Sequence, residues 1–118
     1  LQACIYFKNE LEYEYIFLAT EDAEYFEMFR KALGDRLLSV DQKRVSYDYK
    51  NREYIQVKDL LEIQDGKAAG RNYLAVIHCL SLCDSLLYNI ECGAAQLAEC
   101  WNNNKYRVCR QITAGWKE

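Results

Sequence analysis

Short apolar runs alternate with segments of helical periodicity, and this order limits the fold more than any other feature of the sequence. Four runs have the character of strands, at residues 14–19, 36–40, 85–90 and 106–112. Continuous apolar runs of this kind are typical of strands that are covered on both faces. Strands that alternate with helices predict parallel pairing. We therefore expect an α/β fold, a Rossmann-like parallel sheet with helices on both faces.

Apolar residues recur at helical spacing in four other segments, at residues 1–10, 22–32, 71–82 and 91–101. Thr20 or Asp22 is expected to cap the second helix, and Gly34 is expected to end it. The third segment is apolar almost all round, so it predicts a buried central helix. Residues 41–70 are polar, and they predict two short strands at 44–49 and 54–57, a helical turn at 58–63 and a turn at 65–66.

Length and charge exclude several classes of protein. The 118 residues predict a single domain, residues 1–118, that is large enough to bury a core. A net charge of −3 argues against nucleic acid as a partner. No apolar run reaches the length of about 18 residues that a membrane span needs. The chain begins at Leu1 without a visible signal peptide, so we expect either a fragment or a chain that has lost an N-terminal piece.

The chain contains six cysteines, and their spacing favours free thiols. No Cys-x-x-Cys pair of the kind that binds zinc occurs. Cys79 and Cys83 lie in an apolar helical run, where thiols behave as small hydrophobic groups. We therefore expect mostly reduced cysteines, a reducing compartment and no metal site, with disulfides or a metal as the alternatives.

Two loops are the candidate ligand sites because ligands of parallel sheets bind beyond the carboxyl ends of the strands. The first follows the first strand, and the second precedes the fourth helix, where a glycine allows close approach and the helix N-terminus offers N–H groups. The candidate residues are Thr20, Glu21 and Asp22 in the first loop, and Asn89, Glu91, Cys92 and Gly93 in the second. Helix capping and close helix–strand packing are the structural alternatives.

Other residues have weaker functional interpretations. His78 stands on an apolar helix, where a structural role is favoured over catalysis. A basic cluster in the polar stretch could contact phosphates or a partner domain, although a solvated loop explains it as well, and three tyrosines there could stack on a base or pack on an edge strand. These residues are Lys43, Arg44, Lys50 and Arg52, and Tyr47, Tyr49 and Tyr54.

Several short sequence segments, taken in order, resemble those of a known superfamily over nearly the whole chain. They are Ile-Phe-Leu-Ala-Thr-Glu-Asp at 16–22, Gly-Asp-Arg at 34–36, Gly-Arg-Asn-Tyr-Leu at 70–74 and His-Cys-Leu-Ser-Leu-Cys-Asp at 78–84, followed by Ala94, Ala95 and Asn102. Together they resemble the C-terminal, nucleotide-sugar-binding half of fucosyltransferase-like GT-B glycosyltransferases. That superfamily includes bacterial fucosyltransferases of polysaccharide and nodulation-factor synthesis, and protein or N-glycan fucosyltransferases.

The resemblance implies a donor-binding domain for a GDP-sugar, and GDP-fucose in particular, in an enzyme that makes polysaccharide or glycoconjugate linkages. It implies no metal and no cofactor, because side chains and helix dipoles stabilise the leaving diphosphate. The implied partners are the nucleotide-sugar donor, a glycan acceptor and the missing N-terminal domain. The active site would be a cleft between two domains, so this chain alone is expected to be inactive. The implied location is cytoplasmic or peripheral to a membrane.

Three differences from the family pattern lead to an alternative function. The N-terminal half with its His-x-Arg-type motif is absent, Glu91-Cys92-Gly93 stands where several relatives have serines, and Val76 stands where many have an acid. A non-catalytic, degenerate interaction domain on the same fold is therefore the second hypothesis. A phospho-receiver domain is third, because no buried strand ends in the phosphoacceptor aspartate that it requires.

Overall fold

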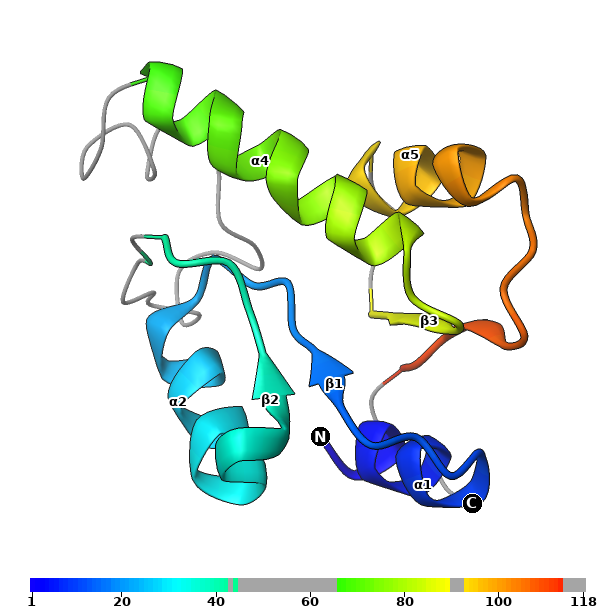
Figure 1. The fold of residues 1–118 in the computed structure, drawn as a ribbon. Coiled ribbons are helices and arrows are strands. Elements are labelled where there is room, and N and C mark those ends of the chain that lie inside the picture. The colour runs from blue at the N-terminus through cyan, green and yellow to red at the C-terminus, as the bar shows by residue number, and fades with distance from the viewer. Residues whose placement is uncertain (43, 45–65, 90–92, 114–118) are drawn as a thin grey trace.

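The structure is a computed structural model, and it describes residues 1–42, 44, 66–89 and 93–113. Helices and strands alternate along these residues (Figure 1). The elements are α1 (Gln2–Glu10), β1 (Ile16–Phe17), α2 (Ala23–Leu33), the 3₁₀ helix η1 (Gly34–Arg36), β2 (Leu37–Leu38), α4 (Gly66–Ser81), β3 (Leu86–Tyr88), α5 (Gly93–Asn102) and β4 (Cys109–Gln111). Within the described ranges, this is the element order that the sequence predicts.

The strands form two parallel pairs. Ile16 of β1 is in register with Leu37 of β2, and Leu86 of β3 with Cys109 of β4. Helix α2 and η1 connect the first pair, and α5 connects the second, so the described chain contains two β-α-β units. The expected mixed α/β class with parallel strands is confirmed.

The expectation of one Rossmann-like sheet is not clearly met. The described strands are two or three residues long and form two separate two-stranded sheets. Residues 34–36 adopt a 3₁₀ turn in front of β2, which shortens that strand, and Leu38 is 46% exposed. The apolar runs overestimate the strands because hydrophobicity marks burial, whereas the described ends of these runs lie outside the paired strand residues.

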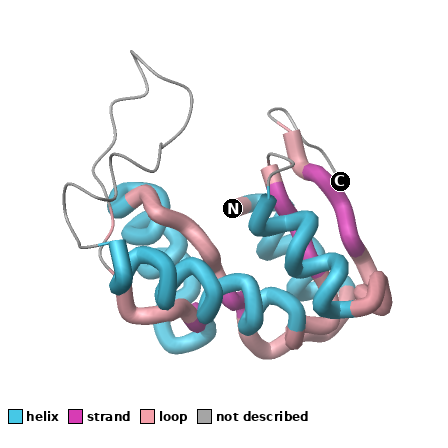
Figure 2. The backbone as a smooth tube through the Cα atoms, turned by 90° about the horizontal axis from the view of Figure 1, so that it is seen from above, coloured by secondary structure: helices cyan, strands magenta, loops and turns pink. Residues whose placement is uncertain are grey.

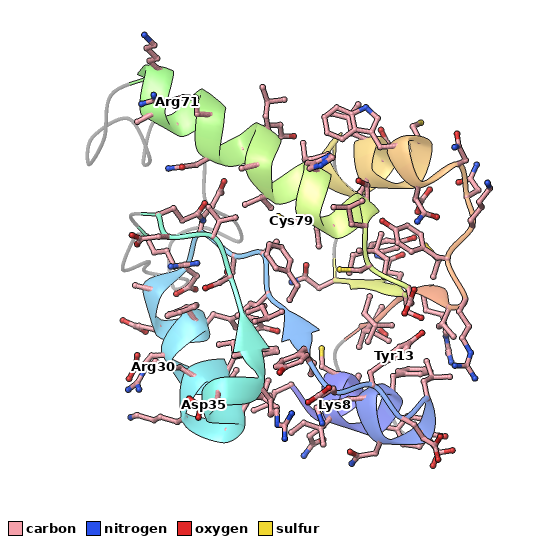
Figure 3. The ribbon with its side chains drawn as sticks, viewed as in Figure 1. Lys8, Tyr13, Arg30, Asp35, Arg71 and Cys79 are labelled. Carbon is pink, nitrogen blue, oxygen red and sulfur yellow. The ribbon has the colours of Figure 1, made fainter. Side chains whose placement is uncertain are left out.

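Helix α1 and the segment after it join the two units. The phenol of Tyr13 lies 2.8 Å from the hydroxyl of Ser85, just before β1 and β3 respectively, and Figure 3 places Tyr13 between α1 and the second strand pair. Phe7 of α1 lies under the guanidinium of Arg110 in β4, with 5.6 Å between the ring centroid and the guanidinium carbon. Cys4 on the same helix lies near Tyr25 of α2. The amino ends of β1 and β3 therefore meet, and both strands lead away from this junction.

Helices α4 and α5 pack together into one layer, which is seen from above in Figure 2. Ile77 and Ala98 are fully buried within it. Asn102 donates from Nδ2 to the carbonyl of Ser81 at 3.0 Å, and Tyr106 donates from its hydroxyl to the carbonyl of Leu80 at 2.7 Å. These bonds hold the C-terminal ends of the two helices together.

The expectation that residues 71–82 form a buried central helix is wrong. Helix α4 begins earlier, at Gly66, and only Ile77 and Ser81 are buried on it. Leu74 is 55% exposed. Among the described elements its main contact is with α5, and apolar residues such as Leu74 and Leu82 remain exposed.

Candidate functional site

The loop after β1 is shaped by the cap of helix α2. Asp22 is 5% exposed, and its Oδ1 accepts hydrogen bonds from the backbone N–H groups of Glu24 at 2.9 Å and Tyr25 at 3.2 Å. Thr20 Oγ1 in turn accepts from the backbone N–H of Asp22 at 3.2 Å. The capping interpretation of Asp22 is therefore confirmed, and its carboxylate is engaged by the helix that it begins.

Two residues that follow β2 bind the same loop. Gln42 donates from Nε2 to the carbonyl oxygen of Thr20 at 3.1 Å, and Arg44 donates from Nε to that oxygen at 3.0 Å. Arg44 also donates from Nη1 to the carbonyl of Gln42 and from Nη2 to that of Val40, at 3.4 and 3.2 Å. The segments beyond the carboxyl ends of β1 and β2 thus meet at the Thr20 carbonyl.

The Arg44 guanidinium lies over the ring of Phe26 in α2, with 3.9 Å from its central carbon to the ring centroid. Burial lowers the pKa of Arg44, and the nearby Asp41 opposes this shift. Among the described residues, no carboxylate forms an ion pair with Arg44. At this edge, a partly buried cation therefore has no carboxylate partner among the residues that the structure describes.

Glu21 supplies an acid to the loop after β1. It is half-buried between Thr20 and Asp22, and burial raises the pKa of its carboxyl. Within the part of the chain that the structure describes, no hydrogen bond or ion pair holds the Glu21 carboxylate. Such a carboxylate is able to accept hydrogen bonds from the hydroxyls of a ligand.

The second candidate loop is described only at its two ends. The carbonyl of Asn89 accepts a hydrogen bond from Gln111 Nε2 at 3.1 Å, which continues the pairing of β3 with β4. Gly93 begins α5, and a Cβ atom added there would lie 3.5 Å from the hydroxyl of Tyr73. Glu91 and Cys92 lie outside the described residues.

The structure thus brings some candidate residues together and leaves others apart. Thr20, Glu21 and Asp22 lie in one loop, and Arg44 contacts that loop at the Thr20 carbonyl. The sequence offered Arg44 only as part of a basic cluster. Asn89 makes no hydrogen bond to this group within the described ranges. Gln42 was missed, because nothing in its sequence context distinguishes a loop glutamine that binds a distant carbonyl.

The remaining candidates have structural roles or lie outside the described part. His78 is exposed on α4 and packs edge-on against the ring of Trp101, at 6.2 Å between centroids, as the structural interpretation expects. Lys43, Lys50 and Arg52, and Tyr47, Tyr49 and Tyr54, lie outside the described residues. The expected strand at 54–57 and the helical turn at 58–63 also lie outside them, as does the expected strand at 44–49 apart from Arg44, which is not in a strand.

The five described cysteines, Cys4, Cys79, Cys83, Cys100 and Cys109, form no disulfide. In the described ranges, no three His, Cys, Asp or Glu residues gather as a metal site would require. None of the helices described is both long and apolar enough to cross a bilayer.

Comparison with protein-family models, curated proteins and solved structures gives no match to this chain.

Proposed function

We propose that this chain is the donor-binding domain of a glycosyltransferase that uses a GDP-sugar, with GDP-fucose as the first candidate. In this proposal the two β-α-β units belong to a Rossmann-like domain. The enzyme would form polysaccharide or glycoconjugate linkages, and a second domain of the same protein would complete the active-site cleft. No metal or cofactor has a part in the proposal.

The observation that carries this proposal is the contact between Arg44 and the Thr20 carbonyl beyond the carboxyl ends of two parallel strands. Arg44 reaches the Thr20 carbonyl at 3.0 Å, and Glu21 is the next residue along the loop. Ligands of parallel α/β folds bind at that edge of the sheet. Arg44, which has no ion pair among the described residues, suits the anionic diphosphate of a nucleotide sugar, and the half-buried Glu21 carboxylate suits its hydroxyl groups.

The arrangement of the strands supports the same interpretation. The Tyr13–Ser85 hydrogen bond joins the amino ends of β1 and β3, so the loops after both strands leave from the ends opposite this junction. Those two loops contain the candidate residues Thr20 to Asp22 and Asn89 to Gly93. In the proposal both loops contact the donor, and Gly93 allows its close approach to α5. The proposed location is cytoplasmic, in keeping with unpaired cysteines.

Calorimetric titration of the full-length protein with GDP, GDP-fucose and UDP tests the proposal. We expect GDP and GDP-fucose to bind and UDP to bind more weakly. We also expect Gly93→Val to abolish binding while circular dichroism shows an intact fold, because the branched side chain fills the space at the start of α5. Absence of GDP binding in the full-length protein would refute the donor-binding role.

A turnover assay tests the domain assignment. The isolated 118-residue chain is expected to release no GDP from GDP-fucose, with or without a glycan acceptor. Measurable transfer by this chain alone would show that no second domain is needed.

A further inference from the structure

We infer that Arg44 binds the diphosphate of the nucleotide, so that this domain itself supplies a cation to the donor. This inference rests on the proposed function and adds to it the residue that recognises the anionic part of the ligand. Three features of Arg44 carry it, each judged from the described residues: a fixed orientation, donors left over from its contacts with carbonyls and a charge without an ion pair.

Backbone carbonyls and one ring fix the orientation of Arg44. Its Nε, Nη1 and Nη2 donate to the carbonyls of Thr20, Gln42 and Val40, at 3.0, 3.4 and 3.2 Å. Phe26 supports the face of the guanidinium at 3.9 Å. A side chain held in this way loses little further conformational freedom when it binds a ligand.

The same guanidinium keeps donors for a ligand. Arginine has five N–H groups, and the contacts with the carbonyls use one on each nitrogen. Counting contacts with described residues alone, one N–H of Nη1 and one of Nη2 are left. Arginine commonly binds phosphate oxygens through two of its N–H groups. Carbonyl oxygens and a ring face also leave the positive charge without a full counter-charge.

The other two described arginines near these strands are paired differently. Arg36 binds Glu14 at 2.6 Å in front of β1 and β2, at the end of the strands opposite Arg44. Arg30 binds Glu27 one turn earlier on α2. Asp41 lies near enough to Arg44 to influence its pKa but forms no ion pair with it. Arg44 is therefore the cation among these three that still has capacity for an anion.

The test compares Arg44→Gln with two matched variants in the full-length protein, by calorimetric titration with GDP, guanosine and inorganic pyrophosphate. Arg36→Gln removes an equal charge at the opposite edge, and Arg30→Gln removes an equal charge on the exposed side of α2. We expect Arg44→Gln to raise the Kd for GDP and for pyrophosphate by about tenfold or more and to leave guanosine unchanged. Both matched variants should bind GDP as the wild type does.

The other possible results of this titration distinguish the role of Arg44 from the proposed function. Equal GDP affinity in the wild type and Arg44→Gln would overturn this inference and leave the proposed function standing. An equal loss of GDP and guanosine in Arg44→Gln would also overturn it, by showing a purely structural role. If Arg44→Gln does not fold, Arg44→Lys replaces it, and wild-type affinity for pyrophosphate in Arg44→Lys would count against bidentate binding. A wild type that binds no GDP would refute the proposed function itself.

Discussion

The phenol oxygen of Tyr13 and the hydroxyl oxygen of Ser85 lie 2.8 Å apart, although 72 positions separate the two residues in the sequence. The same Ser85 oxygen accepts a hydrogen bond from the backbone N–H of Val108 at 3.2 Å. One hydroxyl therefore holds the start of β1, the start of β3 and the residue in front of β4. This contact connects the two β-α-β units by side chains rather than by a shared sheet.

Replacing Ser85 is expected to weaken the junction more than replacing Tyr13. Ser85→Ala removes both hydrogen bonds and leaves the Val108 N–H without this acceptor, which should cost about 2 kcal/mol in free energy of unfolding, whereas Tyr13→Phe should cost about 1 kcal/mol. Urea denaturation measures both. Ser39→Ala, at an exposed serine, is the control and should change stability little. Equal stabilities of Ser85→Ala and the control would show that the junction contributes nothing.

Asp22 allows the structural and ligand-binding roles of its carboxylate to be separated. Asp22→Ala removes the cap of α2 and should cost about 1 kcal/mol of stability, whereas Asp22→Asn retains an acceptor for the helix N–H groups and should cost less. Thermal unfolding measures the difference, with Asp35→Ala in the exposed η1 as the control. If Asp22→Asn also keeps its GDP affinity, the carboxylate charge has no part in donor binding.

The raised pKa of Glu21 predicts a pH-dependent gain in stability on its replacement. Burial disfavours the ionised carboxyl in the folded state, so the native protein binds this proton more tightly than the unfolded chain does. Above the raised pKa, Glu21→Gln should therefore unfold at higher urea concentration than the wild type. This gain should shrink as the pH falls through the raised pKa and should be absent below the ordinary value of 4.5.

Replacing Glu27 should have the opposite effect on stability in the same urea-unfolding measurement. Its hydrogen bond with Arg30 lowers the pKa of its carboxyl, so Glu27→Gln should reduce stability at neutral pH. This loss should disappear as the pH falls through the lowered pKa, below 4.5. If the two variants follow the same pH profile, the assignment of Glu21 as a half-buried acid without a partner is wrong.

The two glycines at helix ends should respond differently to alanine. Gly34 has a φ of 54°, which side chains adopt at a cost, so Gly34→Ala should lose about 1 kcal/mol. At Gly93 the new Cβ would make ordinary contact with Tyr73 at 3.5 Å, so Gly93→Ala should keep or slightly increase stability. Urea unfolding distinguishes the two. A larger loss at Gly93 than at Gly34 would contradict this account.

The cysteines should react as thiols, at different rates. Titration of unfolded, unreduced protein with a thiol reagent should find at least four free thiols, and fewer would contradict the expectation. In the folded protein at pH 8, Cys109 should be alkylated slowly. Partial burial, together with a contact to Glu99, raises the pKa of its thiol to about 11. Glu99→Gln should increase its alkylation rate.

The sequence predicts the local features of the fold well and its long-range features less well. Asp22 as a cap, Gly34 as a helix end and the asparagines after α5 follow from backbone chemistry that acts over a few residues. The last helix indeed ends at Asn102, and Asn103 adopts a left-handed φ of 58°. Parallel pairing followed from the alternation of elements. These features depend on residues that are close together in the sequence, so a single sequence is enough to recognise them.

What the sequence did not predict depends on contacts between distant residues. Arg44 was one of several basic residues in a polar stretch, and no pattern indicated that it would reach the Thr20 carbonyl. The exposed side of α4 was also missed, because an all-round apolar helix can be covered by a core or by something outside the described residues. Strand lengths were overestimated because an apolar run does not mark where hydrogen bonding to a partner ends.

The position of α1 has a consequence for the order of folding. Its Phe7 packs under Arg110, so the first helix of the chain contacts the last described strand. Each β-α-β unit is able to form its own strand pair over a short stretch of chain, but this contact closes a loop through most of the sequence. Such closure is entropically slow. We therefore expect refolding in two kinetic phases, with α1 docking in the slower one, and synthesis must deliver β4 before α1 can dock.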